Sequence, residues 1–246
     1  MINSIHINFN TSFMKKILFV VFCFSVAHFV LAQTPVLDVA VEPYNMGRPE
    51  NGPNGKRFVN SFIGMHFVLP TETNDAAPVK PLSTGFRFGI MNKFRFNDFF
   101  SIGYLLDFNS YNFNYSQSAK KTFPDTLIHK TQNIGLASIG TGLYFRFNFD
   151  VRRGDYLGHY LDLGAYADWL PFRNLYYNDK IDFGQIQHSR ISRLNFVEKY
   201  QYGLFAAVGL NRFTIFGRYR ISDVIKSPYH SAELPRLTIG VGLCLF

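Results

Sequence analysis

The chain of 246 residues is long enough for one or two domains. Hydrophobic residues make up 47% and charged residues 17%, yet the mean hydropathy is near zero. A helical membrane protein would gather its apolar residues into long runs, whereas this balance is typical of strands with one face toward lipid and one toward a polar interior. The net charge of +8 is scattered along the chain rather than clustered, which argues against nucleic-acid binding.

The first predicted element is an export signal. The one long apolar run, 17–31, follows Lys15 and Lys16 and leads into a small-residue cleavage site ending at Ala32. It spans about 15 residues, fewer than the ~20 of a membrane-spanning helix, and has the three regions of a signal peptide. We therefore expect cleavage of residues 1–32, with Met14 as an alternative start. A retained membrane anchor is the competing interpretation.

Residues 33–57 predict an extended periplasmic lead-in. The segment contains four prolines, and Asn-Gly pairs begin at Asn51 and Asn54. Such residues favour turns and extended chain over a packed domain. The lead-in separates the signal from a region, 58–246, with a different pattern.

Eight segments of that region alternate with a period of two, as strands do. One face of each segment is apolar and aromatic, and the other carries Gly, Arg, Asp, Lys and Tyr. Each is long enough to cross a bilayer at a tilt of about 45°. The fourth segment changes phase near its start, which predicts a β-bulge near Ser138. The expected strands are 58–69, 82–94, 99–115, 132–149, 156–170, 194–210, 213–221 and 236–246.

Alternation alone fits a soluble β-sandwich equally well, so the connections decide. They are short after the second, fourth and sixth segments and long after the others, as in outer-membrane barrels. Glycine on the polar face suits a narrow interior. These features favour an all-β protein, an eight-stranded antiparallel up-and-down transmembrane β-barrel after a cleaved signal peptide. The even strand count places both mature termini in the periplasm of a Gram-negative cell. A periplasmic or secreted sandwich is the alternative.

Charged side chains at inward positions predict a polar network in the barrel interior. An unpaired charge in a small lumen is costly, so opposite charges should pair. The result is either a plug of salt bridges without a pore or a narrow selective channel. His66 is expected within hydrogen-bonding reach of Asp107. The predicted network comprises His66, Arg87, Asp107, Arg146, Asp162, Asp168, Lys199, Arg218 and Arg220.

No catalytic arrangement emerges from the strand phases. His188 with Ser189, and His230 with Ser231, are sequence neighbours, and neighbouring residues on a strand point to opposite faces. No metal-ligand cluster, phosphate loop or dinucleotide motif is present, so we expect no enzymatic activity, cofactor or metal. Cys244 is the one cysteine of the expected mature chain and cannot form an internal disulfide.

The longest predicted loop, 171–193, carries Tyr176, Tyr177 and Phe183. Exposed aromatic residues in a surface loop are common in partner-binding surfaces. The other interpretation is that they pack on the barrel rim or extend the fifth and sixth strands as a hairpin above the membrane. The sequence leaves both open.

Several stretches carry a resemblance to a known family: FFSIGY (99–104), RRGDYLG (152–158), YLDLGAY (160–166) and ELPRLTIG (233–240). Over 58–246 the chain resembles the PorT-like outer-membrane β-barrel proteins of the Bacteroidota. The resemblance implies a single-domain outer-membrane barrel, mostly of unassigned function, with one member type linked to type IX secretion and gliding. One departure is the terminal Phe246, which is one residue out of step with the apolar face of the last segment.

These observations predict a non-enzymatic outer-membrane barrel with a structural role, or one in binding a partner or lipopolysaccharide through its extracellular loops. The alternative is a narrow channel, or an accessory subunit of an outer-membrane export or uptake complex of type IX kind. Expected partners are outer-membrane lipid, lipopolysaccharide and a protein of such a complex, and no nucleic acid.

Overall fold

The computed structural model describes residues 52–69, 78–81, 83–150, 154–180, 185–227 and 232–245. The chain divides into two units, Met1–Asn45 and Met46–Phe246, and every described residue belongs to the second. The expected signal peptide, residues 33–51 of the lead-in and the terminal Phe246 lie outside the described residues. Within those residues, no helix combines the length and apolarity needed to traverse a membrane.

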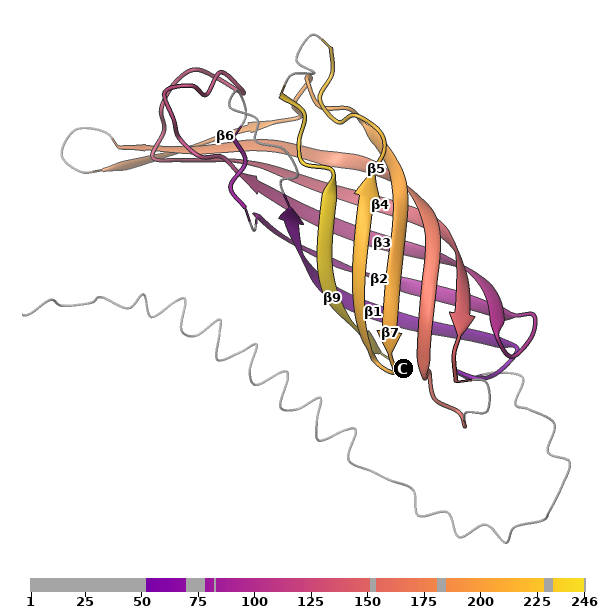
Figure 1. Ribbon diagram of the computed structural model, residues 1–246. Helices are drawn as coiled ribbons and strands as arrows, with labels where there is room; N and C mark the ends of the chain where they lie inside the picture. Colours follow the sequence, from indigo (N-terminus) through magenta and orange to yellow (C-terminus); the bar gives the residue numbers. More distant parts are fainter. Residues whose placement is uncertain are drawn as a thin grey trace, which may run out of the picture. The chain divides into compact units, whose positions relative to one another are not determined.

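The described residues form a closed barrel of eight antiparallel strands and one additional strand, β6 (Figure 1). Sequence neighbours pair around the sheet, β1 pairs with β9, and β5 pairs with both β4 and β7. The predicted all-β, eight-stranded antiparallel barrel is thereby confirmed. The strands are β1 (Arg57–Leu69), β2 (Ser83–Arg95), β3 (Phe100–Asn114), β4 (Thr131–Asn148), β5 (His159–Lys180), β6 (Ile186–Ser192), β7 (Tyr200–Leu210), β8 (Phe213–Arg220) and β9 (Leu237–Leu245).

Alternating side chains give the barrel an apolar outside and a filled inside. In β1, Ile63 and Met65 face outward while Phe62 and His66 are buried. This is the period-two rule of a pleated strand applied to a closed sheet. On each barrel strand at least one large apolar side chain is between 42% and 66% exposed. One such residue per strand is Ile63, Phe88, Leu106, Leu143, Leu163, Leu204, Ile215 and Val241.

The predicted bulge near Ser138 is confirmed. The register between β4 and β5 shifts between Ala137 and Ile139, so Ser138 stands opposite two residues of β5. Those residues are Leu170 and Pro171. Because proline has no backbone N–H, this is a position where the ladder tolerates an interruption.

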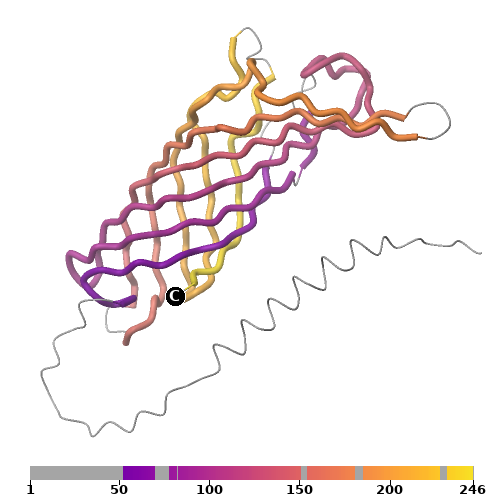
Figure 2. The backbone as a smooth tube through the Cα atoms, turned by 180° about the vertical axis from the view of Figure 1, so that it is seen from behind, coloured from indigo at the N-terminus to yellow at the C-terminus, as the bar shows by residue number. Residues whose placement is uncertain are grey.

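The fifth and sixth strands differ from expectation. β5 continues past the predicted end at 170 to Lys180, and β6 pairs with its outer part as a hairpin. The chain then leaves the sheet at Arg193, whose φ of 58° ends the extended conformation, and β7 begins at Tyr200 rather than at 194. Figures 1 and 2 both show the hairpin reaching beyond the other strands.

The two ends of the barrel have different connections. The turn end carries the connections 96–99, 149–158 and 211–212. There Asn97 Oδ1 accepts the N–H groups of Phe99 (3.0 Å) and Phe100 (2.7 Å). Residues 52–56 also fold across this end, where the Arg95 N–H donates to the Lys56 carbonyl at 2.8 Å.

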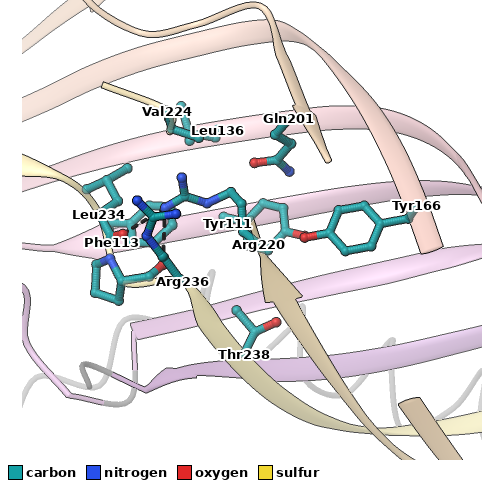
Figure 3. A pocket seen from close by; sticks show the side chains of 11 residues that line it. Tyr111, Phe113, Leu136, Tyr166, Gln201, Arg220, Val224, Leu234, Arg236 and Thr238 are labelled. Carbon is teal, nitrogen blue, oxygen red and sulfur yellow. Dashed lines mark hydrogen bonds between the residues drawn. The ribbon is translucent and has the colours of Figure 1, made fainter. Parts of the chain in front are cut away.

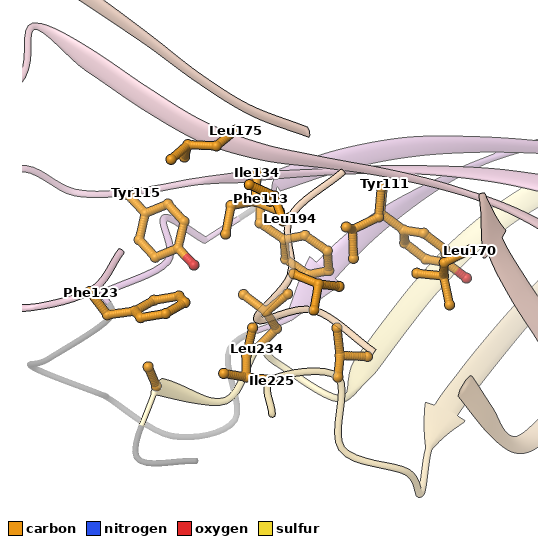
Figure 4. Close-up of a cluster of buried hydrophobic side chains, with 14 of the residues drawn as sticks. Tyr111, Phe113, Tyr115, Phe123, Ile134, Leu170, Leu175, Leu194, Ile225 and Leu234 are labelled. Atoms are coloured by element: carbon orange, nitrogen blue, oxygen red, sulfur yellow. The ribbon is translucent and has the colours of Figure 1, made fainter. Parts of the chain in front are cut away.

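The loop end, at the other side, is closed by buried apolar side chains, which we call the apolar cap (Figure 4). They come from strands and from the connections that follow them, so the loops fold inward over the barrel mouth. This gives the loop end a core of the kind found in water-soluble domains. The apolar cap consists of Val68, Tyr111, Phe113, Tyr115, Phe123, Ile134, Leu136, Leu170, Leu175, Leu194, Val197, Val224, Ile225, Ala232 and Leu234.

Candidate functional site

Four charged side chains meet in the middle of the barrel, and we call them the central ion cluster. Arg87 Nη2 of β2 lies 2.6 Å from Asp107 Oδ2 of β3. Arg218 of β8 approaches the same Asp107 oxygen at 3.4 Å and reaches Asp168 Oδ2 of β5 at 3.0 Å. Two arginines thus alternate with two aspartates across the lumen, and their formal charges cancel.

Neutral groups complete the surroundings of this cluster. Arg218 lies over the Tyr166 ring at 3.7 Å, and Arg87 lies 4.7 Å from the Phe62 ring. Gln201 donates to Asp168 Oδ2 at 2.8 Å. Buried ions are tolerated when they are paired and hydrogen-bonded, and cations gain further from aromatic faces.

A second ion pair lies nearer the turn end. Arg146 of β4 donates through Nε and Nη2 to the two carboxylate oxygens of Asp162 of β5, each at 2.7 Å. The guanidinium lies over the Tyr160 ring at 3.7 Å. Lys93 is also buried here and donates to the Pro53 carbonyl, which ties the folded end of the lead-in to the barrel interior.

A third pair joins the barrel to the loop between β8 and β9. Arg220 Nη1 lies 2.5 Å from Glu233 Oε1, and Glu233 accepts the N–H groups of Val224 and Ile225 at 3.0 Å. Arg220 and Leu234 both line the small pocket drawn in Figure 3, which has a volume of about 20 Å³. One carboxylate thus fixes both a buried arginine and a loop backbone.

The interior is filled rather than open. Besides the 20 Å³ pocket, a cavity of about 40 Å³ lies between the central ion cluster and the turn end, bordered by Met91, Phe205 and Cys244. Such volumes hold one to a few water molecules. Neither provides a continuous column of water, and the apolar cap covers the loop end.

Eight of the nine residues predicted for the interior network are buried: His66, Arg87, Asp107, Arg146, Asp162, Asp168, Arg218 and Arg220. The ninth, Lys199, was wrongly placed, because it precedes β7 and is exposed at the loop end. The chain has left the sheet between Arg193 and Tyr200, so strand alternation does not apply there.

The expected contact between His66 and Asp107 is replaced by other contacts. His66 lies against the Tyr111 ring with 4.7 Å between the centroids. Asp107 accepts hydrogen bonds from Arg87 and Arg218 instead. Two guanidinium groups offer stronger, charge-assisted hydrogen bonds than a neutral imidazole.

A polar cluster in the loop between β3 and β4 was missed by the sequence analysis. His129 Nδ1 lies 2.7 Å from Asp179 of β5, and its Nε2 lies 3.2 Å from Asp125. Lys121 Nζ lies 3.1 Å from Asp125 and 2.5 Å from Gln132. The spacing of Lys121, Asp125 and His129 was the one available signal, but it does not reveal the partner from β5. We call these five residues the loop cluster.

The hydrogen bonds of the loop cluster shift the acidity of Asp125. Burial raises the pKa of this carboxyl, but the hydrogen bonds and charges of Lys121 and His129 outweigh burial. The pKa of Asp125 is therefore below its ordinary value. The hydrogen bonds that hold this loop through Asp125 are strongest when its carboxyl group is ionised.

The aromatic loop candidates belong to the hairpin. Tyr176 and Tyr177 are half-buried in β5; Arg190 lies over the Tyr176 ring at 5.4 Å, and Tyr177 packs against the apolar cap. Phe183 lies outside the described residues. The structure thus contains the hairpin extension that was one of the two interpretations of this segment.

The described residues contain no group of three or more His, Cys, Asp or Glu side chains positioned to hold a metal ion. His188 binds Asn178 Oδ1 through Nδ1 at 2.6 Å, and its neighbour Ser189 is on the other face of β6. His230 and Ser231 lie outside the described residues. The polar side chains described above form ion pairs and hydrogen bonds that hold the barrel and its loops together.

Comparisons with known proteins give distant likenesses to solved structures. No protein-family model matches the chain, and no curated protein matches it. A solved structure of Ail, the attachment invasion locus protein of Yersinia pestis, is 14% identical, with a TM-score of 0.37, over 77% of this chain and 95% of Ail. The complex of Ail with the heparin analogue sucrose octasulfate is 13% identical, with a TM-score of 0.31, over 76% and 94%. The barrel assignment therefore rests on the strand pairing itself.

Replacing Asp168 with alanine should destabilise the barrel by about 3–5 kcal/mol, because it leaves Arg218 buried with the longer contact to Asp107 as its ion pair. Urea unfolding in detergent, followed through the single tryptophan, Trp169, measures the loss. The control is Asp223→Ala, which breaks an exposed ion pair with Arg236 and should cost less than about 1 kcal/mol. Equal losses in the two variants would contradict the role given to the central ion cluster.

The loop cluster predicts a pH-dependent protection of the loop 116–130. Because folding lowers the pKa of Asp125, its contribution is present above the unfolded value of about 3.9 and is lost as the pH falls through the folded pKa. Asp125 Oδ1 accepts the Leu127 N–H at 3.1 Å, so Asp125→Asn should exchange that amide hydrogen faster than the wild type at pH 7. The difference should shrink as the pH falls through the folded pKa of Asp125. Asp155→Asn at the turn end is the control. No difference at pH 7 would refute the assignment.

Proposed function

We propose that this protein is a non-enzymatic outer-membrane β-barrel whose lumen does not conduct and whose loop end binds an external partner or lipopolysaccharide. The observation that carries the proposal is a closed barrel that is apolar outside and filled with compensated charges inside. Each part of the proposal has its own support.

Membrane insertion is supported by the outer surface and by closure. A ring of large apolar side chains covers every strand of the barrel, and such a continuous surface is unfavourable in water. A closed sheet pairs its backbone groups all around, which hydrocarbon requires. Each of the eight barrel strands has eight or more residues, near the length that spans a bilayer. The export signal expected at 1–32 and the alternation of short and long connections favour the outer membrane.

A non-conducting lumen is supported by the central ion cluster, by the two further ion pairs and by the apolar cap. Charges that are already paired with one another across the lumen favour a closed interior over a path for ions. The cap places buried apolar side chains over the mouth, and dry constrictions of this kind oppose ion passage. These features favour the plugged barrel over the narrow channel.

A binding role is supported by the loop end. The described parts of its connections are held by the apolar cap, by Glu233 and by the loop cluster, so they form a preorganised surface. The exposed cations Lys199 and Arg193 suit contact with lipopolysaccharide phosphates. Membership of the PorT-like family, suggested by the sequence resemblance, would be consistent with an accessory role beside an outer-membrane complex.

The proposal predicts that the purified protein is heat-modifiable on gels, is recovered in the outer-membrane fraction, and gives no steady current in planar bilayers. An open porin reconstituted in the same way provides the positive control. A steady, ion-selective current from folded protein would contradict the plugged barrel and favour the narrow channel. Recovery in the soluble periplasm would contradict membrane insertion.

A further inference from the structure

We propose that the open edge of β6 binds an extended, acidic segment of a partner protein, which joins the sheet as an additional strand. The inference rests on the proposed function, because it names the partner class that the loop end takes. It is carried by the pairing of β6, by the positions of its side chains and by its charge.

β6 has one paired edge in the part of the chain that the structure describes. It pairs with Asn174–Lys180 of β5 in an unbroken register, and no other described strand pairs with it. Figures 1 and 2 show this hairpin projecting past the barrel. The other edge of such a strand presents unpaired N–H and C=O groups. Extended polypeptide is the ligand that satisfies them.

The direction in which the N–H and C=O groups of β6 point follows from the residue pairs that β5 forms with β4 and with β6. Asn178 of β5 pairs with Thr131 of β4, and its carbonyl accepts the Lys130 N–H at 3.0 Å, so its backbone faces β4. His188 stands opposite Asn178 on the other side. Because backbone groups alternate along antiparallel strands, the N–H and C=O of His188 face the open edge.

The side chains of β6 leave this edge accessible. The His188 ring turns back to bind Asn178 at 2.6 Å, and the Arg190 guanidinium lies over Tyr176 at 5.4 Å. Both therefore lean over β5 instead of extending beyond the edge. Arg190 is the one charged side chain of the strand apart from His188, and the strand has no proline and no bulge, which are common means of protecting an edge.

The hairpin is held in place before any partner arrives. β4 pairs with β5 as far as Asn178, and His129 both contacts Asp179 and lies against the Tyr177 ring at 4.7 Å. A strand that is already fixed loses little conformational freedom on binding, which favours affinity.

Charge selects the kind of segment. Arg190 and Arg193 are exposed and form no ion pair with a described residue, and the sequence 185–193 contains no acidic residue. Opposite charges on facing strands stabilise pairing, and like charges oppose it. If a second copy of β6 paired antiparallel with the first, centred on Ser189, each His188 would stand opposite the Arg190 of the other copy. The paired strands would then carry twice as many arginines and no acidic residue. An acidic partner strand therefore fits better than self-association.

The test uses the purified folded protein in detergent and a fluorescent nine-residue peptide of alternating valine and glutamate, read by anisotropy. The same peptide with lysine for glutamate, and one with proline for valine, should bind at least tenfold more weakly. His188→Pro removes an outward N–H and should lower affinity at least tenfold, while His188→Thr keeps that N–H and should stay within about twofold. Arg190→Glu should weaken binding about fivefold, and Lys56→Glu at the turn end should not change it.

Each outcome decides one part. Absence of binding by the acidic peptide, or equal binding by His188→Pro, overturns the edge proposal. Equal affinity for the lysine peptide overturns the preference for acidic segments. If the protein forms dimers and His188→Pro dissociates them, the occupant of the edge is a second copy of this chain instead. Every sample is first checked for heat-modifiable migration. Folded protein that binds no peptide refutes only this inference, whereas failure of that check refutes the proposed function.

Discussion

The ladder between β1 and β9 is the interaction on which the rest of the structure depends. It joins the first and last strands from Ser61 opposite Leu245 to Leu69 opposite Leu237. Without it the barrel sheet would have two open edges, and the backbone groups along those edges would lack partners. Because this ladder closes the sheet, each side chain of the barrel points either to the outer surface or into the lumen. A lumen enclosed by eight strands is narrow.

That narrow radius explains the residues found inside. At Gly209 a Cβ atom would overlap the Tyr160 ring, and at Gly140 it would overlap the Asp168 carboxylate. Glycine therefore makes room for the rings and carboxylates that surround each arginine. The charges then cancel within bonding distance, and the lumen becomes a packed polar core. The cap, the loop cluster and the hairpin give the loop end a fixed structure of its own.

The sequence allowed the strand faces, the bulge at Ser138 and most buried charges to be predicted, because period-two alternation reports directly which way a side chain points. It left the hairpin of β5 and β6 as one of two interpretations and ended the fifth strand at 170, since alternation carries no information about where a strand leaves the barrel. Lys199 was misplaced for the same reason. The partners of Asp107 depend on the stagger between strands, and the contact of His129 with Asp179 joins residues far apart in the chain. Such pairings are visible only once the register is known.

Closure can be measured directly by a cross-strand disulfide between β1 and β9. Met65 and Val241 are paired and both face outward, and directly opposite residues in antiparallel strands lie within the Cα separation of a disulfide. In a variant with Met65→Cys and Val241→Cys, and with Cys23 and Cys244 replaced by alanine, mild oxidation of the folded protein should form the bond and shift its gel migration. The matched pair Met65→Cys and Leu204→Cys, separated by two strands, should not react. An unreactive first pair in folded protein, or equal reaction of both pairs, would contradict the closed barrel.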